Sequence, residues 1–187
     1  MPDLPKLTCT DSDCDRDLHC FRPTSWVNPD PAPRCRDCGA DLIAWEQLHQ
    51  RQISNADLLF SQLPKELIRH HFWHMDIPES MIRKTKRYRP EVIADRTEKA
   101  IRSHVGEAAD DWDGQQTPME HADNAQIYFC GMHATACCCR KCMQYWHGIP
   151  ADRPLTEAEI TYFAALVWKY VCIRIGWSEH HDLLLGP

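Results

Sequence analysis

The chain has 187 residues, including 11 Cys and 11 His, and carries a formal net charge of −6. Its length suits one domain with at most a small added module, and its seven Trp and 43% hydrophobic residues exclude intrinsic disorder. No apolar run approaches the roughly 20 residues that span a bilayer, and the N-terminus lacks a secretory signal, so we expect a cytoplasmic protein with reduced thiols that contacts no membrane.

Residues 1–50 are rich in Cys and Pro and show little helical periodicity, which predicts a loop-rich module. Two closely spaced pairs supply its candidate metal ligands: Cys9, Cys14, Cys35 and Cys38. Zinc favours four tetrahedral thiolate or imidazole ligands, and two such pairs are typical of a zinc ribbon. Because the gap between the first two cysteines is loose, His19 and Cys20 are alternatives to either of them. Gly39 allows the second turn a positive φ.

Residues 51–187 predict a helical domain. Prolines at 64, 78 and 90 stand where a proline opens a helix, and they predict helices over 65–75, 79–88 and 91–109. A short β-like run follows at 126–129. The strongest helix is expected over 156–175, because Thr156 and Glu159 form a capping box and Gly176 offers a stop. Trp168, Cys172 and Ile173 lie off its main apolar stripe, which predicts burial on more than one side.

A basic stretch lies within this helical region. Between residues 83 and 102 there are eight Lys or Arg and three Asp or Glu. Cations with an interleaved aromatic ring could contact the phosphates and bases of a nucleic acid. The candidate residues are Arg83, Lys84, Lys86, Arg87, Tyr88 and Arg89. The alternative is a solvated helix face, which the acidic charge of the whole chain favours.

Metal-binding side chains are concentrated again between residues 133 and 148. Cys139-x2-Cys142 followed by a His five residues later begins like a zinc knuckle. The candidate ligands of this second site are His133, Cys138, Cys139, Cys142 and His147. An iron–sulfur cluster is a rival occupant because four thiols fall within six residues, and a thiol-rich site without metal is a third interpretation.

Four short motifs occur in a fixed order in this region, and their order and spacing match those of a known family. They are GQQTPM at 114–119, HATACCCRKC at 133–142, YWHGIP at 145–150 and RPLT at 153–156. Together they resemble an uncharacterised, mostly bacterial family known as domain of unknown function 4186. The resemblance is strongest over 113–175 and does not extend to the N-terminal module. Its pattern matches these residues: His133, Thr135, Cys138, Cys139, Arg140, Cys142, Trp146 and His147. Cys137 falls where the family usually has Thr, and the family implies no activity.

These observations predict a mainly α protein in which a loop-rich zinc-ribbon-like module precedes a small helical domain with a Cys/His metal-binding core. Both sites would hold zinc. We expect a binding or interaction module, for nucleic acid or protein, rather than an enzyme. The alternative is a metal-dependent hydrolase or nuclease that uses His133, Cys139, Cys142 and His147, with an open metal position for water.

Overall fold

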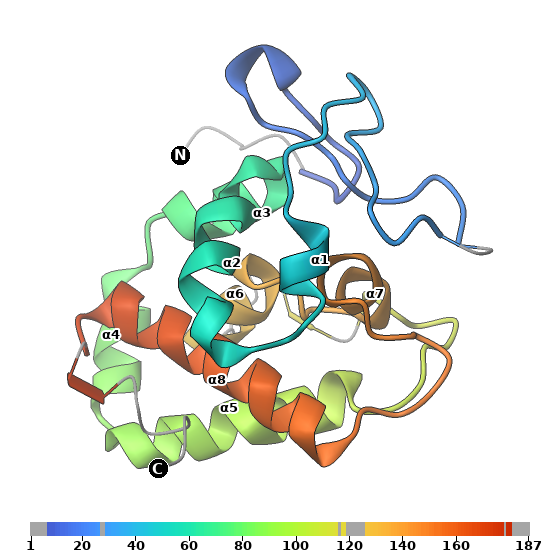
Figure 1. Ribbon diagram of the computed structural model, residues 1–187. Helices are drawn as coiled ribbons and strands as arrows, with labels where there is room; N and C mark the ends of the chain where they lie inside the picture. Colours follow the sequence, from blue (N-terminus) through green and yellow to red (C-terminus); the bar gives the residue numbers. More distant parts are fainter. Residues whose placement is uncertain (1–6, 27–28, 116, 119–125, 178, 181–187) are drawn as a thin grey trace.

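The computed structural model describes residues 7–26, 29–115, 117–118, 126–177 and 179–180, and within these ranges the chain is mainly helical (Figure 1). The described residues form eight α-helices and no sheet. They are α1 Trp45–Leu48, α2 Ala56–Gln62, α3 Leu67–His74, α4 Glu79–Lys86, α5 Pro90–Val105, α6 Ile127–Ala134, α7 Arg140–His147 and α8 Glu157–Ile175. This confirms the predicted fold class. None of these helices combines the length and the apolar character that crossing a membrane requires.

Residues 7–26 and 29–44 are loops that contain one 3₁₀ turn, Cys14–Arg16, and they lie at one end of the molecule (Figure 1). They are not separate from the helices. Phe21 packs edge-on against Trp146 of α7, with ring centroids 6.1 Å apart, and Trp45 of α1 lies 5.1 Å from the same ring. One continuous hydrophobic core therefore includes Phe21 and Cys35 together with the helices.

Helix α8 begins and ends as the sequence predicts. The Thr156 hydroxyl accepts from the Glu159 N–H at 3.3 Å, the Glu159 carboxylate accepts from the Thr156 N–H at 2.9 Å, and Gly176 ends the helix with a φ of +72°. The helix packs against α5 and α6. Its buried residues include Trp168 and Cys172, whereas Ile173 is 48% exposed. The burial of Trp168 and Cys172 confirms that α8 is buried on more than one side, although Ile173 does not belong to the buried surface.

The β-like run at 126–129 was misassigned, because Gln126 is the N-cap of α6 and residues 127–129 form its first turn. A short apolar run fits a buried strand and a buried helix equally well, since periodicity distinguishes them only over longer segments. Here the run is apolar because α6 is buried between α3 and α8. Gly131 permits the close contact: a Cβ on it would lie 2.9 Å from a methyl carbon of Val167.

Candidate metal centres

The first group of metal-binding atoms lies in the N-terminal loops. Cys14, His19, Cys35 and Cys38 place one ligand atom each within 4.8 Å of all the others. The Sγ atoms of Cys14 and Cys35 are 3.7 Å apart, and the Cys38 Sγ lies 3.4 Å from the His19 Nδ1. Three of the four cysteines predicted from spacing thus come together, with His19 in the place expected for Cys9. Such a Cys₃His set matches a closed zinc site.

Backbone geometry around this group favours thiolates. Gly39 adopts a φ of +75°, and its N–H donates to the Cys35 carbonyl at 2.8 Å, which closes the turn. Burial alone raises the pKa of Cys35, but backbone hydrogen bonds from Cys38, Cys20 and Asp37 outweigh it and lower that pKa to about 6. The other ring nitrogen of His19 lies 2.9 Å from the Asp17 carboxylate, an arrangement that orients metal-binding imidazoles.

The second group consists of three buried thiols at the start of α7. Cys138, Cys139 and Cys142 have their Sγ atoms within 4.8 Å of one another, and the three residues are between 0% and 4% exposed. Cys139 is the N-cap of α7, and its sulfur accepts from the Cys142 N–H at 3.3 Å. Cys138 precedes the helix, and its sulfur lies 3.7 Å from that of Cys142. The sequence CCRKC therefore places three sulfur atoms around one point.

A buried arginine from α3 contacts this thiol group. Arg69 donates from Nη2 to the Cys142 sulfur at 3.0 Å and from Nη1 to the Cys138 sulfur at 3.6 Å. Its Nε pairs with the Glu66 carboxylate at 3.0 Å, and both side chains are essentially inaccessible to solvent. Glu66 also accepts from the Tyr145 hydroxyl and the Trp146 indole at 3.0 and 2.9 Å. Sequence analysis missed the roles of Arg69 and Glu66. Nothing in the sequence around α3 indicates that these two side chains contact residues about 70 positions later in the chain.

The two histidines predicted as ligands lie elsewhere. The His147 Nε2 is 2.9 Å from the Thr135 carbonyl and its Nδ1 is 3.2 Å from the Tyr162 hydroxyl, so both ring nitrogens have protein partners. His133 stacks on Phe72 with ring centroids 4.5 Å apart, and it stands outside the three-thiol group. Burial lowers the pKa of His133 to about 4 and that of His147 to about 3. Both imidazoles are therefore neutral parts of the core.

Helix geometry explains why His147 does not reach the thiols. A zinc knuckle needs a turn between its second cysteine and its histidine, whereas α7 continues from Arg140 to His147. Five residues of α-helix rotate a side chain by about 140° relative to the starting residue. Cys142 and His147 therefore face different sides of α7.

Comparison with known families agrees with this part of the chain. The family model described as a domain of unknown function, DUF4186, matches residues 57–172, which is more than half of the sequence. The chain belongs to the DUF4186 family. The matched range contains Arg69 and the three-thiol group, whereas the Cys₃His group precedes it. No solved structure matches the chain.

The remaining DUF4186 motif residues hold the segment around α7 in place. Arg140 is buried and donates to the carbonyls of Glu107 and Pro150 at 2.5 and 2.8 Å. Asp113 accepts from the Arg140 N–H at 2.7 Å at the start of the helix. Cys137 is buried and lies 3.3 Å from the Thr135 hydroxyl, outside the thiol group. Gln116 and Met119 of the GQQTPM motif lie outside the described residues.

Gly148, which ends α7, is expected to tolerate no side chain. Its φ is +63°, and a Cβ would lie 2.9 Å from the His49 ring. Gly148→Ala therefore combines left-handed strain with a steric clash. We expect it to lower the free energy of unfolding by about 1–3 kcal/mol more than Gly176→Ala. Gly176 is the matched control, because its φ is +72° but no atom lies within 4 Å of the added Cβ. Urea denaturation measures both variants, and equal losses would contradict the clash.

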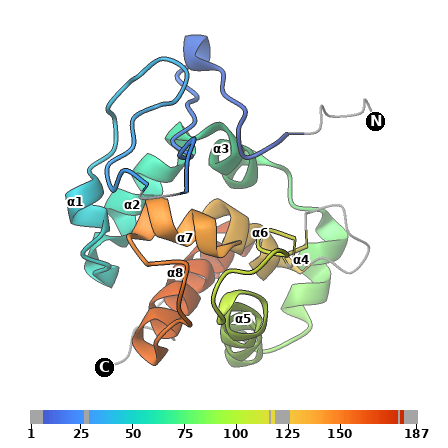
Figure 2. The ribbon, with the colours of Figure 1, turned by 90° about the vertical axis from the view of Figure 1, so that its right-hand side faces the viewer.

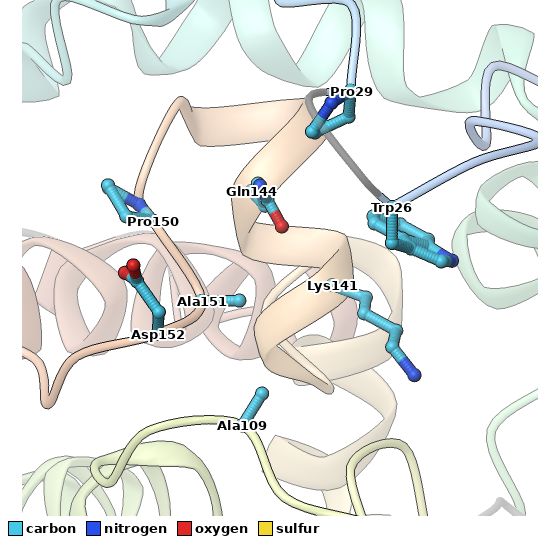
Figure 3. Close-up of a pocket in the computed structure, with 8 residues that line it drawn as sticks. All are labelled: Trp26, Pro29, Ala109, Lys141, Gln144, Pro150, Ala151 and Asp152. Carbon is cyan, nitrogen blue, oxygen red and sulfur yellow. The ribbon is translucent and has the colours of Figure 1, made fainter.

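A pocket of about 400 Å³ lies beside α7 in the DUF4186 domain (Figure 3). Its lining residues come from α7, two adjoining loops and the N-terminal segment: Trp26, Pro29, Ala109, Lys141, Gln144, Pro150, Ala151 and Asp152. Figure 3 shows Trp26 on one side of the helix and the 150–152 loop on the other. None of these residues is a cysteine or a histidine. The pocket therefore gives no access to the three thiols.

The predicted basic residues lie at the end of α4 and in the loop before α5. These five cations and Tyr88 are all exposed, and Arg83 pairs with Glu79 at 3.2 Å. Tyr88 is 40% exposed, and the Arg96 guanidinium from α5 lies 3.9 Å from its ring centroid. One face of the tyrosine ring is thus covered by a cation of the same chain.

Proposed function

We propose that this DUF4186 protein binds two zinc ions that stabilise its fold, and that it acts as a binding module rather than as an enzyme. The observation that carries the proposal is the burial of the second thiol group, whose members are at most 4% exposed. Catalytic zinc keeps one coordination position open for water or substrate, whereas structural zinc is enclosed by protein ligands.

The chemistry of the first group supports zinc over iron. Three thiols and one imidazole form a common structural zinc set, whereas iron–sulfur clusters use four thiolates or, in Rieske centres, two histidines. The three thiols of the second group are soft ligands that also suit zinc. Since metal ligation consumes thiolates, neither group is left with a free nucleophile under this proposal.

A hydrolase that uses the second site receives no support from the geometry. Its proton carrier would be His133 or His147. The ring nitrogens of His147 already contact Thr135 and Tyr162, and the buried His133 stacks on Phe72 outside the three-thiol group. The described pocket beside α7 is lined by residues such as Lys141 and Asp152, and none of the three thiols is among its lining residues.

The exposed basic residues support a polyanionic partner, and we propose a single-stranded nucleic acid. Lys84 and Lys86 from α4 adjoin Arg87 and Arg89 from the following loop, and all four are exposed. Arg96, held against Tyr88, adds a fifth cation beside them. Closely spaced cations favour phosphate contacts, and the second face of Tyr88 offers a surface for a base.

Salt dependence tests this partner. Fluorescence anisotropy with a labelled single-stranded oligonucleotide should show affinity that falls steeply as salt rises. A variant in which Lys84, Lys86, Arg87 and Arg89 are changed to Gln should bind more weakly. It should also reduce the slope of log K against log salt by roughly 3, at about 0.7 per phosphate contact.

The matched control changes four exposed cations elsewhere to Gln: Arg16, Arg34, Arg36 and Lys99. It removes the same charge and should leave the slope almost unchanged. Salt-independent binding, or equal weakening in both quadruple variants, would contradict a nucleic-acid surface at residues 84–89.

A further inference from the structure

The pocket beside α7 has side chains of opposite charge on different walls. Lys141 comes from α7, and Asp152 comes from the loop that follows the helix. Figure 3 shows the Asp152 carboxylate on one side of the pocket and the Lys141 ammonium on the other. Gln144 lies three residues after Lys141 and so shares its face of α7. A cation, an amide and an anion therefore surround one cavity of about 400 Å³.

The fold does not use these three polar side chains. Within the ranges that the structure describes, the Lys141 ammonium, the Gln144 amide and the Asp152 carboxylate take part in no hydrogen bond and no ion pair. Arg153, the cation next to Asp152 in the chain, instead pairs with Glu159 at 2.6 Å. A few polar groups that converge on a concave site fix the orientation of a bound ligand. The three side chains are therefore available to a ligand.

The other lining residues are apolar: Trp26, Pro29, Ala109, Pro150 and Ala151. The Trp26 ring is half-buried, and its centroid lies 6.3 Å from that of Tyr145 and 6.0 Å from the Lys141 ammonium. It therefore forms an apolar wall beside the cation. A volume of about 400 Å³ is near the lower end of the roughly 300–1,000 Å³ of small-molecule sites, which restricts the ligand to a small one.

Hydrogen bonds hold the walls of the pocket in place. The Ala109 N–H donates to the Ala151 carbonyl at 2.7 Å, which joins the loop after α5 to the loop after α7. Arg140 donates to the Pro150 carbonyl at 2.8 Å and so ties the second loop to α7 itself. A preformed site loses less conformational freedom when a ligand binds, so more of the contact energy appears as affinity.

The charge balance of the lining favours a ligand that carries both charges. One Lys and one Asp give the lining residues a net charge of zero. A ligand with a single charge would pair with one of these groups and leave the other without a partner. A nucleotide phosphate would meet one lysine and would be repelled by Asp152, since like charges brought together weaken binding. An amino acid has both a carboxylate and an ammonium and can pair with both residues.

We propose that this pocket binds a small zwitterion of the amino-acid class that has an apolar side chain. The Lys141 ammonium pairs with the ligand carboxylate, the Asp152 carboxylate pairs with the ligand ammonium, and the ligand side chain packs on Trp26. The site uses none of the zinc ligands and none of the basic residues at 84–89, so it goes beyond the proposed function.

Analogues that lack one charge test the assignment on the unmodified full chain. In an NMR titration, the indole signal of Trp26 should shift saturably with phenylalanine, leucine, methionine or tryptophan. Phenethylamine lacks the carboxylate, and 3-phenylpropionate lacks the ammonium. Each should bind about tenfold more weakly than phenylalanine, because one charged contact is lost.

Variants of the two charged residues assign each contact. Lys141→Met should weaken phenylalanine binding about tenfold and leave phenethylamine binding unchanged. Asp152→Asn should weaken phenylalanine binding to a similar extent and leave 3-phenylpropionate binding unchanged. The matched controls are Lys99→Met and Asp76→Asn, at exposed positions outside the lining residues, and they should bind every probe as the unmodified chain does.

Three results would overturn the proposal. One is the absence of a saturable shift with all four amino acids. Another is adenosine monophosphate binding more tightly than phenylalanine. The third is an equal loss of phenylalanine affinity in the pocket variants and in the control variants.

Discussion

We expect Cys142→Ser to remove one zinc ion and to abolish cooperative folding of the DUF4186 domain. Cys142 is completely buried, and its sulfur contacts two other thiols and the Arg69 guanidinium. Structural zinc contributes roughly 10–16 kcal/mol in small peptides, which is comparable to the roughly 5–15 kcal/mol of net stability in a whole domain. Losing the ion also leaves Arg69 facing a polar hydroxyl in place of a thiolate.

Cys137→Ser is the matched control for this effect. Cys137 is equally buried, but it contacts the Thr135 hydroxyl and stands outside the thiol group. We expect this variant to keep two zinc ions and a cooperative thermal transition, as measured by circular dichroism. If both variants lose cooperative folding to the same extent, the cause is the removal of a buried sulfur atom rather than the loss of a metal ligand.

We expect Arg69→Met to lower the free energy of unfolding by about 3–5 kcal/mol. The Glu66 carboxylate then remains buried without its ion-pair partner, and removing one member of a buried pair is more costly than removing both. At roughly 2–4 °C per kcal/mol for a chain of this size, the melting temperature falls by about 6–20 °C. Thermal denaturation of the zinc-loaded protein measures the change.

Two comparisons isolate the buried charge. Arg102→Met breaks contacts with Glu98 and Glu157 on the surface, and it should lower the stability far less than Arg69→Met does. Adding Glu66→Gln to Arg69→Met should recover part of the lost stability. A loss below 1 kcal/mol in Arg69→Met, or no recovery in the double variant, would contradict a stabilising role for this ion pair.

Local signals predicted some helix ends and missed others: Pro64 lies in a 3₁₀ turn before α3, and α4 and α5 end at Lys86 and Val105, short of the predicted 88 and 109. Thr156, Glu159 and Gly176 determine the ends of α8 through contacts within a few residues, so sequence alone suffices there. Pro78 and Pro90 similarly mark the starts of α4 and α5. The run at 126–129 failed because its conformation depends on burial between α3 and α8, which local periodicity does not encode.

The metal ligands were predictable in type but not in grouping. Spacing identified Cys35 and Cys38, which share one turn, and the cysteines of the CCRKC segment. Cys9 stands outside the first group, and the adjacent residues His19 and Cys20 gave no basis in the sequence for choosing which of them replaces it. Arg69 carries no local signal at all, because its role arises only when α3 lies against the start of α7.

The metal content of the purified full-length chain tests the central claim most directly. Element analysis against protein concentration should give about two zinc ions per chain, with no absorbance in the visible range. One zinc ion or none, or iron accompanied by visible absorbance, would contradict the account of two structural zinc sites.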